Sequence, residues 1–354
     1  MSEQKKILIV KMSAIGDVIH TLPALNAIRK QFPDARITWL VEEAAADIVL
    51  GHKALDRVIV SKRKQWIKEL FSLNCGHAIK NIRNFLKELR NTKYDMIIDF
   101  QTLFKSGIMV MFAKGDRKIG FNKGMEHAES SHIFYNKRIR PVSMEIHALE
   151  RGLLLLKSLN IPCKKIEYDL PVTNQEKQSI DNLLKQKDID PEKPIICINP
   201  QATWETKLWD IKKFALLSDR LKKKYHAQIV FTGGESDQEA VNDIVSMMKL
   251  PGINLAGLTT LKTLAALYEK AALLVTTDTG PMHLAAAMGT KIVAIFGSTA
   301  PWRTGPYGSN KFVVRSGVYC SPCFKRECST KECMENINVD DVMKGVKQLM
   351  GRNS

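Results

Sequence analysis

The sequence predicts an α/β protein with two Rossmann-like domains in tandem, each built on a parallel sheet. Three observations carry this prediction. Short runs rich in β-branched residues alternate with helical patterns along the chain, which is typical of βαβ units. A strand, a glycine-containing turn and a helix follow one another in each half, at Gly16 and at Gly280. A polar stretch with several prolines separates the halves at 164–193.

Each half shows strand-like runs bounded by turn residues. In the first half we expect strands at Lys6–Lys11, Arg36–Val41, Arg57–Val60, Met96–Phe100 and Lys118–Phe121. In the second half we expect them at Ile195–Asn199, Gln228–Thr232, Leu273–Thr277, Lys291–Phe296 and Phe312–Arg315. Apolar residues at helical spacing predict helices at Val18–Gln31, Lys212–Lys224, Leu261–Glu269 and Met282–Met288.

The prolines and the loss of strand character set the domain limits. We expect a first domain at 1–170, a linker at 171–193, a second domain at 194–335 and a C-terminal helix at 336–354. Because parallel sheets bind ligands at the carboxyl ends of their strands, a cleft between the domains is the expected ligand site.

Composition is that of a soluble globular protein. The chain has 354 residues, of which 45% are hydrophobic and 25% charged. No apolar run is long enough to span a bilayer and the start does not resemble a signal peptide, so we expect a cytoplasmic protein. The net charge is +16, and residues 1–170 carry 29 basic against 18 acidic residues. That excess attracts phosphates in lipids, nucleotides or nucleic acids, or serves solubility alone.

Seven cysteines are present, and an odd number in a cytosolic protein argues against a disulfide framework. Four of them, Cys320, Cys323, Cys328 and Cys333, lie within fourteen positions. Four thiols can hold a structural zinc ion, although the second pair lacks the usual two-residue spacing. The alternative is a set of reduced cysteines in a surface loop.

The first turn places a carboxylate near a helix start. A strand runs to Lys11, Gly16 allows a tight turn, and a helix is expected to begin near Asp17. This is not the Gly-x-Gly-x-x-Gly fingerprint, which disfavours a nicotinamide enzyme. The helix dipole keeps such a carboxylate ionised, so it can accept a proton from a hydroxyl nucleophile. The alternative is simple capping of the helix.

The second turn repeats this pattern. The strand ending at Thr277 leads into Asp278, Thr279 and Gly280, with Pro281 fitting the first helical turn and His283 following. The free amide groups of a helix start bind anions such as a diphosphate. The alternative is capping by Asp278 or Thr279 together with a packed histidine.

A loop after the strand 195–199 carries a lysine. Lys207 lies where it would face the cleft and neutralise charge on a leaving diphosphate. Thr203 and Thr206 offer hydroxyl donors, and Trp204 and Trp209 either stack on a base or pack internally. Lys207 could equally be an ordinary exposed lysine.

The segment 62–93 is strongly basic. It contains nine Lys or Arg and two Glu, with apolar residues at helical spacing. It begins with Lys62, Arg63 and Lys64, which are candidate contacts for a phosphorylated lipid or a membrane surface. A core-packed amphipathic helix with a solvated basic face is the alternative. Lys105, which follows another strand end, is a further acceptor-side candidate.

These motifs together resemble glycosyltransferase family 9, the bacterial lipopolysaccharide heptosyltransferases, over nearly the whole chain. The matching segments are 10–25 (VKMSAIGDVIHTLPAL), 41–43 (VEE), 99–106 (DFQTLFKS), 147–151 (HALER), 206–209 (TKLW), 278–286 (DTGPMHLAA) and 296–299 (FGST).

The resemblance implies a GT-B fold and transfer of L-glycero-D-manno-heptose from ADP-heptose. The acceptor would be 3-deoxy-D-manno-octulosonic acid (Kdo) on lipid A, or heptose of the inner core, at the cytoplasmic face of the inner membrane. Transfer would be inverting and would need no metal cofactor. Asp17 would be the general base of an acceptor-binding first domain. Lys207 and Asp278–Gly280 would hold the ADP diphosphate in the second domain, with Thr203 and His283 nearby.

Two departures from the family pattern leave open which heptose transfer in core assembly the protein would catalyse. Ala202-Thr203 stands where first heptosyltransferases tend to have paired threonines. The cysteine cluster resembles second-type enzymes, whereas Val41-Glu42-Glu43 resembles the first type. A different sugar donor or acceptor is one alternative function. Another is a non-catalytic nucleic-acid-binding protein, although the sequence has none of the usual nucleic-acid signatures.

Overall fold

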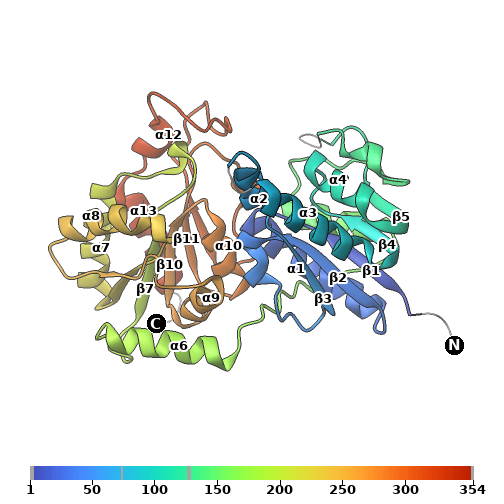
Figure 1. Cartoon of the computed structure of the whole chain (residues 1–354). Coiled ribbons are helices and arrows are strands. Elements are labelled where there is room, and N and C mark those ends of the chain that lie inside the picture. Colours follow the sequence, from blue (N-terminus) through green and yellow to red (C-terminus); the bar gives the residue numbers. More distant parts are fainter. Residues whose placement is uncertain (1–3, 73–74, 126–128, 352–354) are drawn as a thin grey trace. The chain divides into compact units, whose positions relative to one another are not determined.

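The computed structural model describes residues 4–72, 75–125 and 129–351 (Figure 1). The chain divides into two compact units, Met1–Pro171 and Val172–Ser354. Within the described residues each unit contains one six-stranded sheet, and all neighbouring strands in both sheets are parallel.

Unit 1 has the strand order β3-β2-β1-β4-β5-β6. Its strands are β1 (Lys6–Val10), β2 (Arg36–Glu42), β3 (Arg57–Ser61), β4 (Lys93–Asp99), β5 (Lys114–Phe121) and β6 (Lys137–Ile139). Its α-helices are α1 (Ile15–Gln31), α2 (Arg63–Leu70), α3 (Cys75–Arg90), α4 (Phe104–Phe112) and α5 (Ala148–Lys157), with 3-10 turns at Glu43–Ile48 and Ser131–Phe134.

Unit 2 has the order β12-β11-β10-β7-β8-β9. Its strands are β7 (Ile195–Asn199), β8 (Gln228–Phe231), β9 (Ile253–Asn254), β10 (Leu273–Thr277), β11 (Ile292–Ile295) and β12 (Lys311–Val314). Its α-helices are α6 (Asn174–Gln186), α7 (Ile211–Tyr225), α8 (Gln238–Met247), α9 (Leu261–Lys270), α10 (Gly280–Ala287), α11 (Pro301–Thr304), α12 (Glu332–Glu335) and α13 (Val339–Met350), with 3-10 turns at Glu205–Lys207 and Glu235–Asp237.

The expected strands all form, and two short edge strands were missed. β6 and β9 have only three and two residues, too few to show a periodic pattern. The range expected to be a linker contains α6, which packs against α9 through the ion pairs Lys177–Glu269 and Lys270–Asp181. Its start is marked by Thr173 and Glu176, the capping-box spacing that identifies a helix N-terminus.

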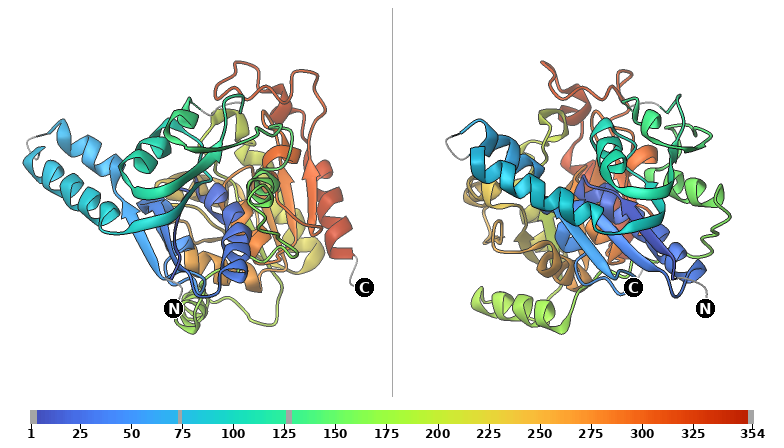
Figure 2. Two further views of the ribbon diagram at one scale, coloured as in Figure 1. Left: turned by 90° about the vertical axis from the view of Figure 1, so that its right-hand side faces the viewer. Right: turned by 45° about the vertical axis from the view of Figure 1, so that its right-hand side comes forward.

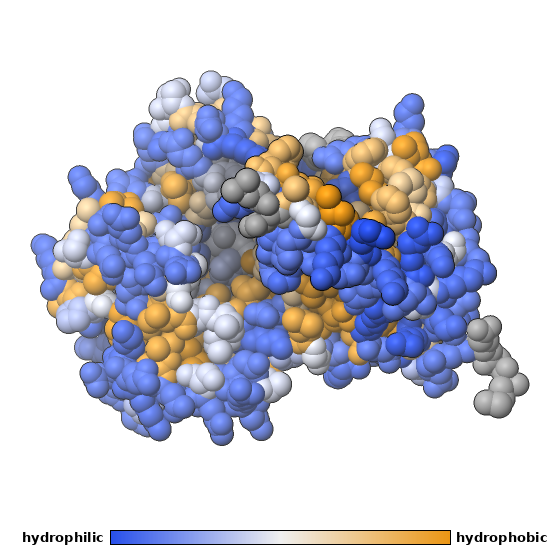
Figure 3. Space-filling model, viewed as in Figure 1, coloured by the Kyte–Doolittle hydropathy of each residue, from blue (hydrophilic) through white to orange (hydrophobic). Residues whose placement is uncertain are grey.

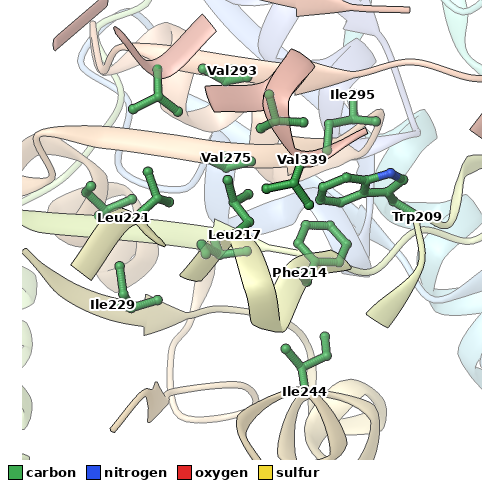
Figure 4. Packing of buried hydrophobic residues seen from close by; sticks show 14 of the residues in the cluster. Trp209, Phe214, Leu217, Leu221, Ile229, Ile244, Val275, Val293, Ile295 and Val339 are labelled. Carbon is green, nitrogen blue, oxygen red and sulfur yellow. The ribbon is translucent and has the colours of Figure 1, made fainter. Parts of the chain in front are cut away.

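The central strands are buried on both faces because helices cover each side of a parallel sheet. In β7 and β10 every residue is buried, and side chains alternate between the faces. One face of the unit 2 sheet packs against α7 and α13, where Trp209, Phe214 and Val339 lie together (Figure 4). In unit 1, Trp66 and Phe85 from α2 and α3 join the core formed by β1, β2 and β4.

Candidate active site

Each sheet has a point at which the strand order reverses, and ligands of open parallel sheets bind there, at the carboxyl ends of the strands. In unit 1 this point lies between β1 and β4, and in unit 2 between β7 and β10. The loop after β1 leads to Asp17 and the loop after β4 carries Gln101. The loop after β7 leads to Lys207, and Asp278 follows β10.

Asp17 lies in the first turn of α1, which begins at Ile15. Its carboxylate accepts a hydrogen bond of 3.2 Å from the Ala14 amide, so it does contribute to capping. Its side chain nevertheless remains 38% exposed, and Lys11 Nζ lies 4.0 Å from its Oδ2. The carboxylate is therefore held in place by the Ala14 amide and is still accessible to solvent.

Lys11 follows β1 and is almost fully buried. Its ammonium donates to the Phe100 carbonyl at 3.2 Å. Burial lowers the pKa of Lys11, and the nearby carboxylates of Asp17 and Asp99 oppose that shift. This buried cation raises the electrostatic potential around the Asp17 carboxylate.

Asp99 and Gln101 hold the two loops together. The Gln101 side-chain oxygen accepts hydrogen bonds from the Met12 and Ser13 amides, at 3.0 and 2.9 Å. The buried Asp99 carboxyl accepts from Gln101 and Thr102 amides and from two hydroxyls, those of Ser106 and Tyr135. Burial raises the pKa of Asp99, while those hydrogen bonds oppose the shift.

A cavity of about 190 Å³ lies beside Asp17 within unit 1. Its polar lining includes Lys11, Asp17, His20, Thr21, Gln101 and Arg151. The His20 ring packs edge-on against the His147 ring, with centroids 5.0 Å apart, and His147 caps α5. Arg151 donates to the Met144 and Ile146 carbonyls. The cavity combines the Asp17 carboxylate with two cations, Lys11 and Arg151, which suits an anionic hydroxyl-bearing ligand.

The structure brings two of the four predicted acceptor-side cations together. Glu42, at the end of β2, pairs with Arg63 at 3.3 Å and with Lys105 at 3.2 Å. Lys105 also donates to the Ser13 hydroxyl at 2.6 Å, within the loop that leads to Asp17. Lys62 pairs instead with Glu43 at 2.8 Å, and Lys64 is exposed on α2.

In unit 2, Lys207 and Asp278 meet directly. Lys207 Nζ lies 2.7 Å from Asp278 Oδ2, and the side chains are only 16% and 6% exposed. The Thr299 hydroxyl donates to the same carboxylate oxygen at 2.7 Å. Lys207 is therefore not an ordinary surface lysine, because it is held at the carboxyl end of the sheet.

The helix α10 begins beside this pair. Thr279 has extended backbone geometry and precedes Gly280 and Pro281 in the first turn. His283, one turn along, is buried. Thr203 lies exposed in the loop before the 3-10 turn at Glu205–Lys207. The start of α10 and the Lys207 ammonium lie together at the carboxyl end of the sheet, an arrangement suited to binding a diphosphate.

The cysteine-containing loop packs against the Lys207 turn. The Thr206 hydroxyl contacts the Ser298 hydroxyl at 2.9 Å and donates to the Lys325 carbonyl at 2.6 Å. The Trp204 ring contacts two cations, with Lys207 Nζ 4.4 Å and the Arg326 guanidinium 5.3 Å from its centroid. Trp204 thus braces Lys207, whereas Trp209 packs in the core and donates to the Ile337 carbonyl.

Close packing at this point requires glycine. A Cβ at Gly297 would lie 2.5 Å from Met334 Sδ and 2.7 Å from the Thr206 carbonyl oxygen. The backbone after β11 therefore approaches the Lys207 turn so closely that no residue type with a Cβ atom fits at position 297.

The predicted zinc site does not form. Among residues 4–72, 75–125 and 129–351, no three His, Cys, Asp or Glu side chains are placed to hold a metal ion together. The four cysteines differ in burial: Cys333 packs in the core of unit 2, whereas Cys320 is exposed and Cys323 and Cys328 are partly exposed.

Sequence reasoning missed several residues that complete these sites. Lys11, Glu42, Gln101, Arg151 and Thr299 were not singled out as functional. All but Arg151 lie at or just beyond the carboxyl end of a strand, and this position was the signal that could have identified them.

Comparisons with known proteins match this architecture. The family model described as glycosyltransferase family 9 (heptosyltransferase) matches residues 82–334. Lipopolysaccharide heptosyltransferase 1 of Pseudomonas aeruginosa is 30% identical over 343 residues, covering 95% of this chain and 91% of that protein.

Solved structures agree over almost the full length. The glycosyl transferase family 9 protein from Veillonella parvula has a TM-score of 0.83 at 21% identity, covering 100% of this chain and 99% of that one, which shows the fold. E. coli heptosyltransferase WaaC, solved with ADP, has a TM-score of 0.76 at 25% identity, covering 97% and 99%. The same enzyme with ADP-2-deoxy-2-fluoro heptose has a TM-score of 0.73 at 26% identity, covering 99% and 100%.

The two units of parallel sheet and the likeness to solved heptosyltransferases show a glycosyltransferase with the GT-B fold. The chain belongs to glycosyltransferase family 9, the heptosyltransferases, and is therefore an enzyme rather than a non-catalytic binding module. Within the part of the chain that the structure describes, no helix has the length and apolar character needed to cross a membrane.

Proposed function

We propose that this enzyme transfers L-glycero-D-manno-heptose from ADP-heptose to a sugar hydroxyl of the lipopolysaccharide inner core. The proposal depends on the side chains found in each sheet at the point where the strand order reverses. Unit 1 holds an accessible carboxylate in a cationic cavity. Unit 2 holds a lysine at a helix start, suited to a diphosphate. Relatives named as heptosyltransferases, one of them solved with ADP, support the donor.

Asp17 is the proposed general base. It accepts the proton of the acceptor hydroxyl while the oxygen attacks the anomeric carbon of the heptose. The bond from that carbon to the phosphate oxygen breaks on the opposite face, so the configuration inverts. Asp17 ends protonated, and ADP leaves with the bonding electron pair.

Unit 2 is proposed to stabilise the leaving ADP. As the carbon–oxygen bond breaks, negative charge grows on the diphosphate. We propose that the Lys207 ammonium and the Gly280 amide at the start of α10 stabilise this charge. Asp278 and Thr299 orient Lys207, and the Thr279–Gly280 backbone offers amide donors. Thr203 and His283 are proposed to contact the remainder of the donor.

The acceptor is proposed to bind in unit 1. Kdo carries a carboxylate and lipid A carries phosphates, and both suit the cations near the cavity. Lys11 and Arg151 line it, while Arg63 and Lys105 gather at Glu42 nearby. Lys62 and Lys64 extend this basic surface along α2. Because the acceptor is a lipid, we place the enzyme at the cytoplasmic face of the inner membrane.

One experiment tests the substrate assignment. The purified enzyme is incubated with ADP-heptose and either Kdo-bearing lipid A or its mono-heptosylated product, and the acceptor mass is measured. A gain of one heptose on the first acceptor assigns the first transfer, and a gain only on the second assigns a later one. If neither acceptor gains a heptose while another nucleotide sugar is consumed, the proposal is wrong.

A further inference from the structure

The helices α2 and α3 form a hairpin with a second, outward apolar face. Trp66 and Phe85 point into the core and pack together, with ring centroids 5.1 Å apart. Ile67, Leu70 and Phe71 follow at positions i, i+3 and i+4, so they share one side of α2. Their exposed fractions are 43%, 39% and 91%. Large apolar side chains on a surface mark an interaction site when they gather in this way.

Basic side chains border this face. Lys64 and Lys68 lie one turn apart on α2, beside Ile67 and Phe71. On α3, Ile79 is 50% exposed and is followed by Lys80, Arg83 and Lys87, all exposed. Figure 3 shows hydrophobic and hydrophilic residues side by side over this region.

The hairpin has few free acidic groups to offset that charge. Residues 63–90 contain seven Lys or Arg and two Glu. Glu69 accepts from Gln65 at 2.7 Å and lies 3.3 Å from His77, and Glu88 pairs with Arg57 at 2.9 Å. Both acids are therefore engaged within unit 1. In the left view of Figure 2 the far end of the hairpin extends away from the unit 1 sheet.

We propose that the outward face of the α2–α3 hairpin docks on an anionic lipid bilayer. Phe71, Ile67 and Leu70 would enter the boundary between headgroups and acyl chains. The lysines beside them would contact anionic headgroups, since a basic rim around an apolar face is the pattern of interfacial helices. Nucleic acid would suit the lysines but not the exposed apolar side chains. This inference rests on the proposed function in one respect: a lipid-linked acceptor would be presented at such a membrane surface.

Sedimentation with vesicles tests the docking face. The full chain is mixed with vesicles of phosphatidylcholine alone or of phosphatidylcholine with phosphatidylglycerol. We expect binding to the anionic vesicles and at least about tenfold weaker partitioning for Phe71→Glu, which places a charge among acyl chains. Lys68→Gln should weaken binding roughly fivefold at low salt, an effect that added salt removes. Leu258→Glu is the matched control: Leu258 is 47% exposed in unit 2, and this variant should bind normally.

The outcomes separate docking from catalysis. Equal binding of Phe71→Glu and the unaltered protein, or equal binding to both vesicle types, would overturn the proposal. A circular dichroism melt confirms that the variants fold. Turnover on a soluble, deacylated acceptor should be unchanged by Phe71→Glu. If the enzyme transfers no heptose but the vesicle pattern holds, the proposed function fails and the docking inference stands.

Discussion

Lys207 and Asp278 form a largely buried ion pair, 2.7 Å between Nζ and Oδ2, at the carboxyl end of the unit 2 sheet. Lys207→Ala would leave the Asp278 carboxylate buried without its cation, so we expect a loss of about 3 kcal/mol in unfolding free energy. We also expect at least about tenfold weaker ADP binding, since charged hydrogen bonds are lost. Urea unfolding and calorimetric titration with ADP measure the two effects.

A double variant separates stability from function at this pair. Lys207→Met with Asp278→Asn removes both charges together, so stability should recover to within about 1 kcal/mol of the unaltered protein. ADP binding should stay weak because the cation is missing. Recovery of ADP affinity in this variant would show that Lys207 does not hold the diphosphate.

Replacing Asp17 is expected to lower the rate of transfer without changing ADP binding. Asp17→Asn keeps the shape of the side chain but cannot accept a proton, so the transfer rate should fall roughly 10²- to 10⁴-fold. ADP binding should be unchanged, because the residues proposed to bind the nucleotide lie in unit 2. Near-normal transfer by this variant would remove Asp17 from the mechanism.

Because of Lys11, the free energy of unfolding should change with pH in the alkaline range. Its pKa in the folded chain lies below the ordinary 10.5 because it is buried. Between the two pKa values the unfolded chain binds more protons, so the unfolding free energy should rise with pH toward 10.5. Lys11→Met should abolish that rise without lowering stability at neutral pH. Transfer should nevertheless slow, since the cation beside Asp17 is gone.

Asp99 supports the loop that carries Gln101. Asp99→Ala would remove the carboxylate that accepts from the Tyr135 hydroxyl and from the Gln101 and Thr102 amides, so we expect at least about 3 kcal/mol of destabilisation. Asp99→Asn retains one oxygen and should cost clearly less. Thermal and urea unfolding of both variants measure the difference, and equal losses would contradict the role of the hydrogen bonds.

The cysteines should differ in reactivity. Hydrogen bonds from the Lys331 and Thr330 amides lower the pKa of Cys328, whereas burial raises the pKa values of Cys197 and Cys333. Since the thiolate is the nucleophile, iodoacetamide should modify Cys328 well before either buried cysteine. Peptide mass spectrometry after timed labelling gives the order. Early labelling of Cys333 would contradict its packing in the core.

Local sequence patterns were sufficient to predict most of the elements. The strand limits at Ile195–Asn199 and Leu273–Thr277 match the structure, because buried parallel strands are continuous apolar runs. The edge strand Ile253–Asn254 has too few residues to form a pattern. The cysteine spacing indicated a metal site, but the spacing could not show that Cys333 turns into the core.

By itself the sequence determined the fold class, the two strand–turn–helix junctions and the residues Asp17, Lys207 and Asp278 that follow them. These are local properties, set by periodicity and turn chemistry. Only the tertiary structure decided which side chains meet. Lys11 donates to the Phe100 carbonyl, and Arg63 and Lys105 share Glu42, because strand order brings together loops that are far apart in sequence. Lys207 and Asp278 are paired for the same reason: β7 and β10 are neighbours in the sheet, although the first positions after them, Pro200 and Asp278, are 78 residues apart in sequence.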